Sequence, residues 1–315
     1  MDRMSPDEYR DESAAQAVAD SEASGEYIVG LDPSGTLVRP VVTPRFAPSC
    51  THEALASLGD LARRRDWAVQ THISENKAEI EMVAELFPEA KHYTDVYDTA
   101  GLLGSKTILA HAVHLTGAEV ALVKQRGSHI AHCPLSNTCL TSGAAPVRDL
   151  LDAGVSVGLG TDMSGGYSPS VLEMVRQALG VSRHVAMEKG ERYKLTVEEA
   201  LWLATRGGAE VMGLGEKVGA FEIGREWDAI MVVMEDVDDG GIDEGEEGKV
   251  QKEAKDTTFS TPMDAFKWQK KNWNDVVAKW VYTGDDRNVG AVWVKGRLVH
   301  QTGVADAVLG GTLHE

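Results

Sequence analysis

Short apolar runs alternate with amphipathic segments through the first two thirds of the chain. Five runs have the largely continuous apolar or β-branched character that is typical of strands covered on both faces. They span residues 38–46, 67–74, 106–111, 128–134 and 155–162. Because strands that alternate with helices form parallel sheets, the pattern predicts an α/β fold of the doubly wound or the barrel type.

The segments between these runs carry helix signals. Residues 51–66 place their leucines on a single stripe, which is the mark of an amphipathic helix. The segments that begin at Thr116 and Thr196 each have a glutamate three positions later, Glu119 and Glu199. This spacing is typical of a capping box, in which the two side chains satisfy free backbone amides at a helix N-terminus.

The two ends of the chain have a different character. Residues 1–37 contain a charged, Ala-rich segment that predicts a helix and then a Gly/Pro turn region, with no convincing strand. After residue 212 the pattern predicts a turn and a β-pair in 213–233 and a hairpin in 289–300 around Lys295-Gly296. We therefore expect residues 38–212 to hold about five β/α units of a barrel and residues 213–315 to hold part of a small β-domain.

An acidic stretch interrupts the expected β-domain. Residues 235–248 hold eight acidic side chains, no basic one and four glycines. Such a segment cannot bury enough apolar surface to order itself. We expect residues 235–260 to form a disordered surface insertion, and an acidic tether is the alternative interpretation.

Side chains that can bind a metal, transfer a proton or bind a substrate lie at the C-terminal end of every predicted strand. They are Arg45, His72 with Glu75, His111, His132 and Asp162. A parallel barrel gathers the carboxyl ends of its strands into one mouth, where active sites lie. Histidine nitrogens and carboxylate oxygens are ligands of catalytic zinc, which keeps one position open for water, and a nearby acid or base moves protons. The pattern therefore predicts a metal-dependent hydrolytic site.

Taken singly, each of these residues also has a structural interpretation. A histidine at a strand end, such as His72 or His111, is more often a hydrogen-bonded core residue than a ligand. Glu75 suits the N-terminus of a helix, where the dipole favours a negative charge, and Asp162 suits a turn. The functional interpretation depends on their convergence at one edge of the sheet.

Several motifs together resemble those of the guanine deaminases, a family of the amidohydrolase superfamily. The motifs are VTPRF, THISEN, LAH, AHCPLSN and GLGTDMSGGYS, and they occur here in the order and spacing of that family. The resemblance continues into LATRGGAEVMGL, GAFEIGREWDAI and YTGDDRNV. It implies a (β/α)8 barrel with one zinc ion per site and a hydrolytic reaction that converts guanine and water to xanthine and ammonia.

The resemblance also implies roles for individual residues. His72 and Asp162 would be zinc ligands, and Asp162 would also take a proton from the attacking water. Glu75 would carry a proton to the purine ring, and His111 would orient the water. These four residues match the family's motifs in THISEN, LAH and GTD.

For the substrate, the resemblance implies that Arg45 and Phe46 hold guanine, the arginine by hydrogen bonds and the phenylalanine by packing on the ring. His72, Glu75 and Asp162 would line the same pocket. A homodimer is compatible with this interpretation.

One feature of the family has no counterpart in this sequence. Its members carry two histidines separated by one residue on the first barrel strand, so that both point to one face and bind one metal. None of the ten histidines here is separated from another by a single residue. We expect the chain to correspond to a guanine deaminase without the front of its barrel. The alternatives are a catalytically inactive interaction protein and an aminohydrolase that acts on another purine, a pterin or a triazine.

Composition limits the partners. The net charge of −18 argues against a nucleic-acid backbone as partner, and no apolar run approaches the roughly 18 residues of a membrane helix. Three cysteines without CxxC spacing and the absence of a signal-peptide pattern at the start favour the cytoplasm.

Overall fold

The computed structural model describes residues 1–234, 272–303 and 305. The chain divides into two compact units, Met1–Gly219 and Ala220–Glu315, which are described separately. The acidic stretch expected to be a disordered insertion, residues 235–260, lies outside the described residues.

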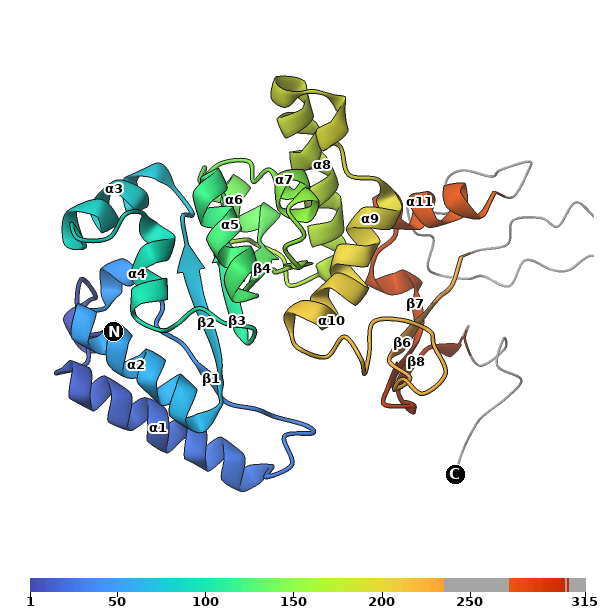
Figure 1. The fold of residues 1–315 in the computed structure, drawn as a ribbon. Helices are drawn as coiled ribbons and strands as arrows, with labels where there is room; N and C mark the ends of the chain where they lie inside the picture. The colour runs from blue at the N-terminus through green and yellow to red at the C-terminus, as the bar shows by residue number, and fades with distance from the viewer. Residues whose placement is uncertain (235–271, 304, 306–315) are drawn as a thin grey trace, which may run out of the picture. The chain divides into compact units, whose positions relative to one another are not determined.

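The first unit contains a five-stranded sheet in which all neighbouring strands are parallel (Figure 1). Its order is β1-β2-β3-β4-β5. The strands are β1 (Val41–Val42), β2 (Ala68–Ile73), β3 (Thr107–His111), β4 (His129–His132) and β5 (Val157–Leu159). The five predicted strands and the α/β class are thus confirmed, although each strand is shorter than its apolar run. That these five strands form part of a (β/α)8 barrel stays a prediction.

Helices connect and cover these strands (Figure 1). They are α1 (Ala14–Leu31), α2 (His52–Arg65), α3 (Lys77–Leu86), α4 (Tyr93–Thr99), α5 (Gly117–Arg126), α6 (Pro134–Cys139), α7 (Val147–Asp152), α8 (Val171–Lys189), α9 (Val197–Trp202) and α10 (Gly208–Val211). Single turns form at η1 (Asp7–Tyr9), η2 (Ala47–Ser49) and η3 (Glu191–Tyr193), and the π-helical η4 (Leu203–Gly207) joins α9 to α10. The capping boxes predicted at Thr116 and Thr196 both form.

Two successive rows of side chains run across the sheet on opposite faces. Thr71, Leu109, Ile130 and Val157 are in register across β2 to β5, and all are buried. The next row, on the opposite face, contains His72 and the small residues Ala110, Ala131 and Gly158. The neighbours of His72 in this row are therefore all small.

A close approach fixes the first helix against the sheet. A Cβ on Gly25 of α1 would lie 2.1 Å from a ring carbon of Trp67, which immediately precedes β2. Only glycine at this position lets the indole ring reach the helix backbone. Helix α1 confirms the helix predicted within residues 1–37. Its Gly25 packs against the ring of Trp67.

The second unit contains an antiparallel sheet of β6 (Ala229–Val232), β7 (Val289–Val294) and β8 (Arg297–Gln301), with η6 (Asp286–Asn288) before β7 and helix α11 (Trp273–Thr283). The hairpin at Lys295-Gly296 is confirmed, because both residues have positive φ angles of 51° and 77°, as a tight β-hairpin turn requires. The prediction of a β-pair within 213–233 is wrong. That segment supplies β6 alone, which pairs with β7, since glycine turns at Gly219 and Gly224 take the place of a second strand.

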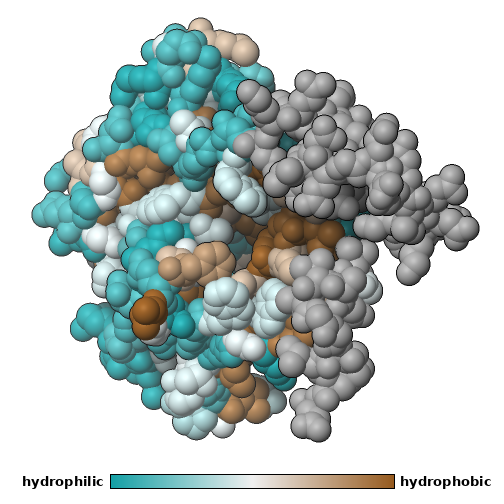
Figure 2. Space-filling model, turned by 90° about the vertical axis from the view of Figure 1, so that its right-hand side faces the viewer, coloured by the Kyte–Doolittle hydropathy of each residue, from teal (hydrophilic) through white to brown (hydrophobic). Residues whose placement is uncertain are grey.

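The surface of the described residues mixes polar and apolar areas. Figure 2 shows hydrophilic surface interspersed with smaller hydrophobic areas on one face, as is ordinary for folded proteins. In the part of the chain that the structure describes, none of the helices combines the length and the apolar character needed to cross a bilayer.

Candidate metal centre

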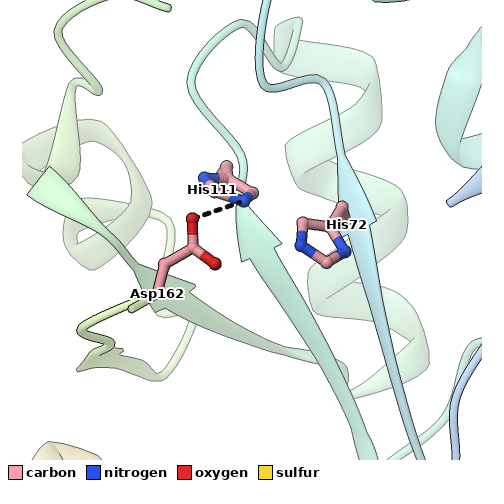
Figure 3. A group of neighbouring side chains, drawn as sticks. All are labelled: His72, His111 and Asp162. Carbon is pink, nitrogen blue, oxygen red and sulfur yellow. Dashed lines mark ion pairs between the residues drawn. The ribbon is translucent and has the colours of Figure 1, made fainter. Parts of the chain in front are cut away.

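Three of the predicted site residues meet at the carboxyl edge of the parallel sheet. His72 lies near the end of β2, His111 is the last residue of β3, and Asp162 follows β5 (Figure 3). Each offers one ligand atom, and these atoms all lie within 4.8 Å of one another. The convergence expected from the strand ends is present for these three residues.

The backbone at the end of β3 aims His111 into the cluster. His111 is in register with Ile73, one step beyond His72, so regular strand alternation would point the two histidines to opposite faces. The chain leaves the extended conformation at His111 (φ 74°) and Ala112 (φ 49°), and the rings of His72 and His111 then stack with centroids 5.0 Å apart. Left-handed backbone at such residues is uncommon and concentrates at functional sites.

The protonation pattern of His72 is set by a backbone carbonyl. Its Nδ1 lies 2.6 Å from the carbonyl oxygen of Arg45, and a carbonyl can only accept a hydrogen bond. Nδ1 therefore carries the proton, and Nε2 keeps a free lone pair. Burial, and next the neighbouring His111, lower the pKa of His72 below its ordinary value, so the ring is neutral and able to bind a metal.

His111 places an unpartnered nitrogen between two carboxylates. Its Nδ1 lies 2.8 Å from Oδ1 of Asn137. Its Nε2 is buried and has no hydrogen-bond partner, and it lies 3.7 Å from Oε2 of Glu75 and 3.8 Å from Oδ2 of Asp162. Buried polar atoms normally have partners, so an orphaned nitrogen facing two anions marks a place for a cation.

The loop after β5 brings the Asp162 carboxylate close to the backbone. Asp162 has a φ of 43°, and its carbonyl oxygen accepts hydrogen bonds from the amides of Gly165 and Gly166. A Cβ on Gly165 would lie 2.6 Å from Oγ of Ser136 and 2.7 Å from Oδ2 of Asp162. Glycine at position 165 therefore makes room for the carboxylate.

Glu75 lies at the rim of the cluster and is held by the loop after α6. The hydroxyl of Ser142 donates to its Oε1 at 2.9 Å, which leaves Oε2 facing Nε2 of His111. Glu75 is partly exposed, whereas His111 is buried. This position suits a group that exchanges protons with a bound molecule.

The other predicted residues lie around these four. Arg45 and Phe46 follow β1; the Arg45 side chain is exposed, and its guanidinium carbon lies 5.2 Å from the centroid of the Phe46 ring. His132, at the end of β4, stays outside the three-residue cluster. Both of its ring nitrogens are buried without partners, and burial, together with His111, lowers its pKa to about 3.

Sequence reasoning missed Asn137 and Ser142, which contact the cluster residues directly. The motif AHCPLSN contributed to the family resemblance, but no role was assigned to Asn137. A polar residue shortly after a strand end was the one available signal for Asn137, and none existed for Ser142.

The donor set fits a divalent transition metal. Two imidazole nitrogens and one carboxylate oxygen are the ligand types of catalytic zinc sites, which have three protein ligands and one open position. The unpartnered Nε2 of His111 and the free Nε2 of His72 both belong to this group.

A parallel α/β sheet with such a donor set at its carboxyl edge is typical of a barrel-type, metal-dependent hydrolase. Comparison with known proteins specifies the class. The protein-family sequence model described as "Amidohydrolase family" matches residues 1–299. The chain belongs to the amidohydrolase family.

The chain is also similar to individual guanine deaminases. It is 45% identical over 300 residues to a probable guanine deaminase of Schizosaccharomyces pombe, covering 95% of this chain and 53% of that protein. Its structure matches E. coli guanine deaminase with a TM-score of 0.79 and 30% identity, covering 96% of this chain and 63% of the other. It also matches guanine deaminase of C. acetobutylicum with guanine bound in the active site, with a TM-score of 0.77 and 32% identity, covering 95% and 64%. The chain thus spans about half the length of the Schizosaccharomyces relative.

Proposed function

We propose that the protein serves the hydrolytic deamination of guanine to xanthine and ammonia, with one zinc ion in its site. The observation that carries this proposal is the cluster of His72, His111 and Asp162, whose ligand atoms lie within 4.8 Å of one another, next to the carboxylate of Glu75. The similarity to guanine deaminases over 95% of the chain supports the choice of substrate.

Metal binding, orientation of the water and proton transfer are assigned to different residues of the cluster. His72 and Asp162 would hold the zinc ion, with His111 in reach of the same point. When bound, zinc supplies a water whose pKa is lowered to near neutrality. Asp162 accepts a proton from the attacking water, and His111 orients that water. Glu75, 3.7 Å from His111, delivers a proton to the ring nitrogen of guanine.

Arg45 and Phe46 would recognise the purine. The Arg45 side chain is exposed, so its guanidinium has donors available for the oxygen and nitrogen acceptors of guanine. The Phe46 ring beside it offers an apolar face for the base. Because Arg45 binds His72 through its backbone carbonyl, replacing its side chain leaves that contact in place.

The test is xanthine formation by the full chain supplied with zinc, followed by ultraviolet absorbance. Arg45→Ala is expected to raise KM for guanine by about 10-fold or more, because each lost polar contact to the base costs roughly 1–3 kcal/mol. Arg63→Ala, on the exposed face of α2, is the matched control and should leave KM unchanged. An active chain whose KM is untouched by Arg45→Ala, or which prefers a triazine or pterin, would refute guanine as the substrate.

A second candidate is a binding protein without catalysis. It is favoured by one observation, that no two histidines in the sequence are separated by a single residue, whereas the family's motif has such a pair. Co-purification of the chain with a full-length guanine deaminase, without zinc binding or xanthine formation by the chain itself, would support this candidate. Failure to associate, together with xanthine formation, would remove it. A homodimer stays a prediction.

A further inference from the structure

We propose that Tyr97 is a positioning residue of the site: its hydroxyl group holds the segment that carries Arg45 and Phe46 at a fixed distance from the strand end that carries His72. This role rests on the proposed function, in which Arg45 and Phe46 bind guanine. Tyr97 has no part in the mechanism above.

The hydroxyl group of Tyr97 bridges two backbone groups that belong to neighbouring segments of the sheet. It lies 2.9 Å from the amide nitrogen of Ala47 and 2.7 Å from the carbonyl oxygen of His72. A backbone amide can only donate and a carbonyl can only accept. The hydroxyl therefore accepts from Ala47 and donates to His72, and neither direction depends on a tautomer or on the orientation of a side-chain amide.

This bridge takes the place of one hydrogen bond of the parallel ladder. In such a ladder, a residue donates its amide to the neighbouring strand, and its carbonyl accepts from the amide two positions further along that neighbour. The amide of His72 donates to the carbonyl of Arg45 at 3.0 Å, so the next ladder bond would run from the amide of Ala47 to the carbonyl of His72. The Tyr97 hydroxyl joins these two groups through an oxygen atom instead.

The bridge lies where the proposed substrate residues meet the proposed metal ligand. Arg45 and Phe46 directly precede Ala47 in the chain, and the carbonyl oxygen of Arg45 also lies 2.6 Å from Nδ1 of His72. The distance between the residues that would bind the base and the strand end at His72 therefore depends on the Tyr97 hydroxyl. A site that holds its substrate in one geometry is sensitive to small displacements of this kind.

The surroundings of Tyr97 keep its hydroxyl in place. The side chain is 0% exposed in α4, and its ring packs against that of Tyr93, one turn earlier, with centroids 5.4 Å apart. The hydroxyl of Thr71 lies 3.0 Å from that of Tyr97 and can donate to it. A buried polar group whose hydrogen bonds are satisfied makes its surroundings rigid, so Tyr97 is suited to act as a spacer.

The two tyrosines of α4 provide a matched pair of variants. Tyr97→Phe removes only the bridging oxygen, so the buried amide of Ala47 loses its acceptor and the carbonyl of His72 loses its donor. Tyr93→Phe removes a buried hydroxyl that donates to Oε1 of Glu79 at 2.7 Å and lies 3.3 Å from the Tyr97 hydroxyl. It leaves the bridge in place. Both variants should lower stability, but only Tyr97→Phe should change the spacing.

The first measurement needs no substrate and uses the full chain. Hydrogen exchange of the Ala47 amide is followed by NMR, relative to that of the buried Leu109 in β3, which reports global unfolding. Tyr97→Phe is expected to speed the relative exchange of Ala47 by about 10-fold or more, because one buried hydrogen bond is lost. Tyr93→Phe should leave the relative exchange close to the wild type.

The second measurement is xanthine formation by the full chain supplied with zinc, which gives kcat and KM. Tyr97→Phe is expected to raise KM for guanine by about 10-fold and to change kcat by less than about 3-fold, because Arg45 and Phe46 would contact the base and not the reacting atoms. Tyr93→Phe should leave both constants close to the wild type.

Arg45→Ala tests whether Tyr97 acts through the segment that it holds. In a chain that already carries Arg45→Ala, Tyr97→Phe is expected to raise KM by less than about 3-fold, because coupled residues have less than additive effects. Fully additive effects of the two changes would overturn the proposal, since Tyr97 would then influence guanine binding by another route.

Unchanged exchange of Ala47 in Tyr97→Phe, or an unchanged KM in an active chain, would also overturn the role of Tyr97. Equal effects in Tyr93→Phe would do the same, because they would reduce the effect to the stability of α4. A wild type that forms no xanthine, with faster relative exchange of Ala47 in Tyr97→Phe alone, would support the spacing by Tyr97 and refute the proposed function. The two failures are therefore distinguishable.

Discussion

Buried polar groups in two regions of the first unit differ in how their hydrogen bonds are satisfied. At the helix N-termini, Glu79 and Glu119 are 7% and 4% exposed, and every oxygen of both has donors. Glu79 accepts from the amides of Glu75 and Asn76 and from the hydroxyl of Tyr93. Glu119 accepts from the amides and hydroxyls of two threonines.

At the carboxyl edge of the sheet, the buried polar atoms lack partners. They include Oγ of Ser74 and Ser136, Nε2 of His111, both ring nitrogens of His132 and Nδ2 of Asn137. Buried groups without partners destabilise a fold, and fully partnered ones stabilise it. The difference shows that the helix caps contribute to stability, whereas the strand ends retain unsatisfied groups that a bound ion or substrate can satisfy.

The largest expected effect comes from removing a proposed metal ligand. Asp162→Ala should lower zinc affinity by more than about 100-fold, which exceeds the usual effect of an outer partner. The free energy of unfolding of the metal-free chain should change by less than about 1 kcal/mol, because Asp162 makes no stabilising contact comparable to a helix cap. Chelator competition and urea denaturation measure the two quantities. A large loss of stability with intact zinc affinity would show that Asp162 acts as a stabilising residue, as a helix cap does, and not in metal binding.

The reverse pattern is expected at a helix cap. Glu119→Ala leaves the donors of Thr94 and Thr116 unpaired and should lower the free energy of unfolding by about 2–3 kcal/mol. Zinc affinity should not change. Glu53→Ala, on the exposed first turn of α2, is the control and should cost less than about 1 kcal/mol. Equal losses in the two variants would show that the cap is not a stabilising feature.

A smaller effect is expected where the backbone makes room for Asp162. A methyl group at position 165 would lie 2.7 Å from Oδ2 of Asp162, so Gly165→Ala must displace the carboxylate. Overpacking of this kind typically costs about 1–3 kcal/mol, and we expect zinc affinity to fall by about 10-fold. Gly180→Ala in α8, where no atom lies within 4 Å of the added carbon, should leave affinity unchanged. Unchanged affinity in both would remove the role assigned to Gly165.

The smallest effect compares two buried serines. The hydroxyl of Ser128 accepts from the amide of Gly104 and donates to its carbonyl, whereas the hydroxyl of Ser136 has no partner. Ser128→Ala should cost about 1 kcal/mol, and Ser136→Ala should be neutral or slightly stabilising. Urea denaturation of both variants measures the difference. A greater cost at Ser136 would contradict the assignment of this edge to binding.

The sequence predicted what depends on local or repeating patterns. The capping boxes at Thr116 and Thr196 follow from a three-residue spacing, and both form. The meeting of His72, His111 and Asp162 follows from a parallel sheet, because strand carboxyl ends share one edge. The family resemblance added the chemistry that these residues would perform.

What the sequence could not predict depends on loop conformation and on contacts between distant residues. Asn137 meets His111 across 26 positions of the chain, and Ser142 meets Glu75 across 67. The helical and strand periodicities of the sequence do not indicate contacts between such distant residues. Strand alternation would even have pointed His111 away from His72, and only the left-handed backbone at the end of β3 brings the rings together.

The most direct test of the central claim is the zinc content of the full chain after equilibration with the metal and removal of the excess, measured by atomic spectrometry. The wild type is predicted to retain one zinc ion per chain, and the double variant His72→Ala, Asp162→Ala is predicted to retain none, while Glu119→Ala keeps it. A wild type without zinc, or a double variant that still holds an equal amount, would contradict the assignment of the strand ends as a metal site.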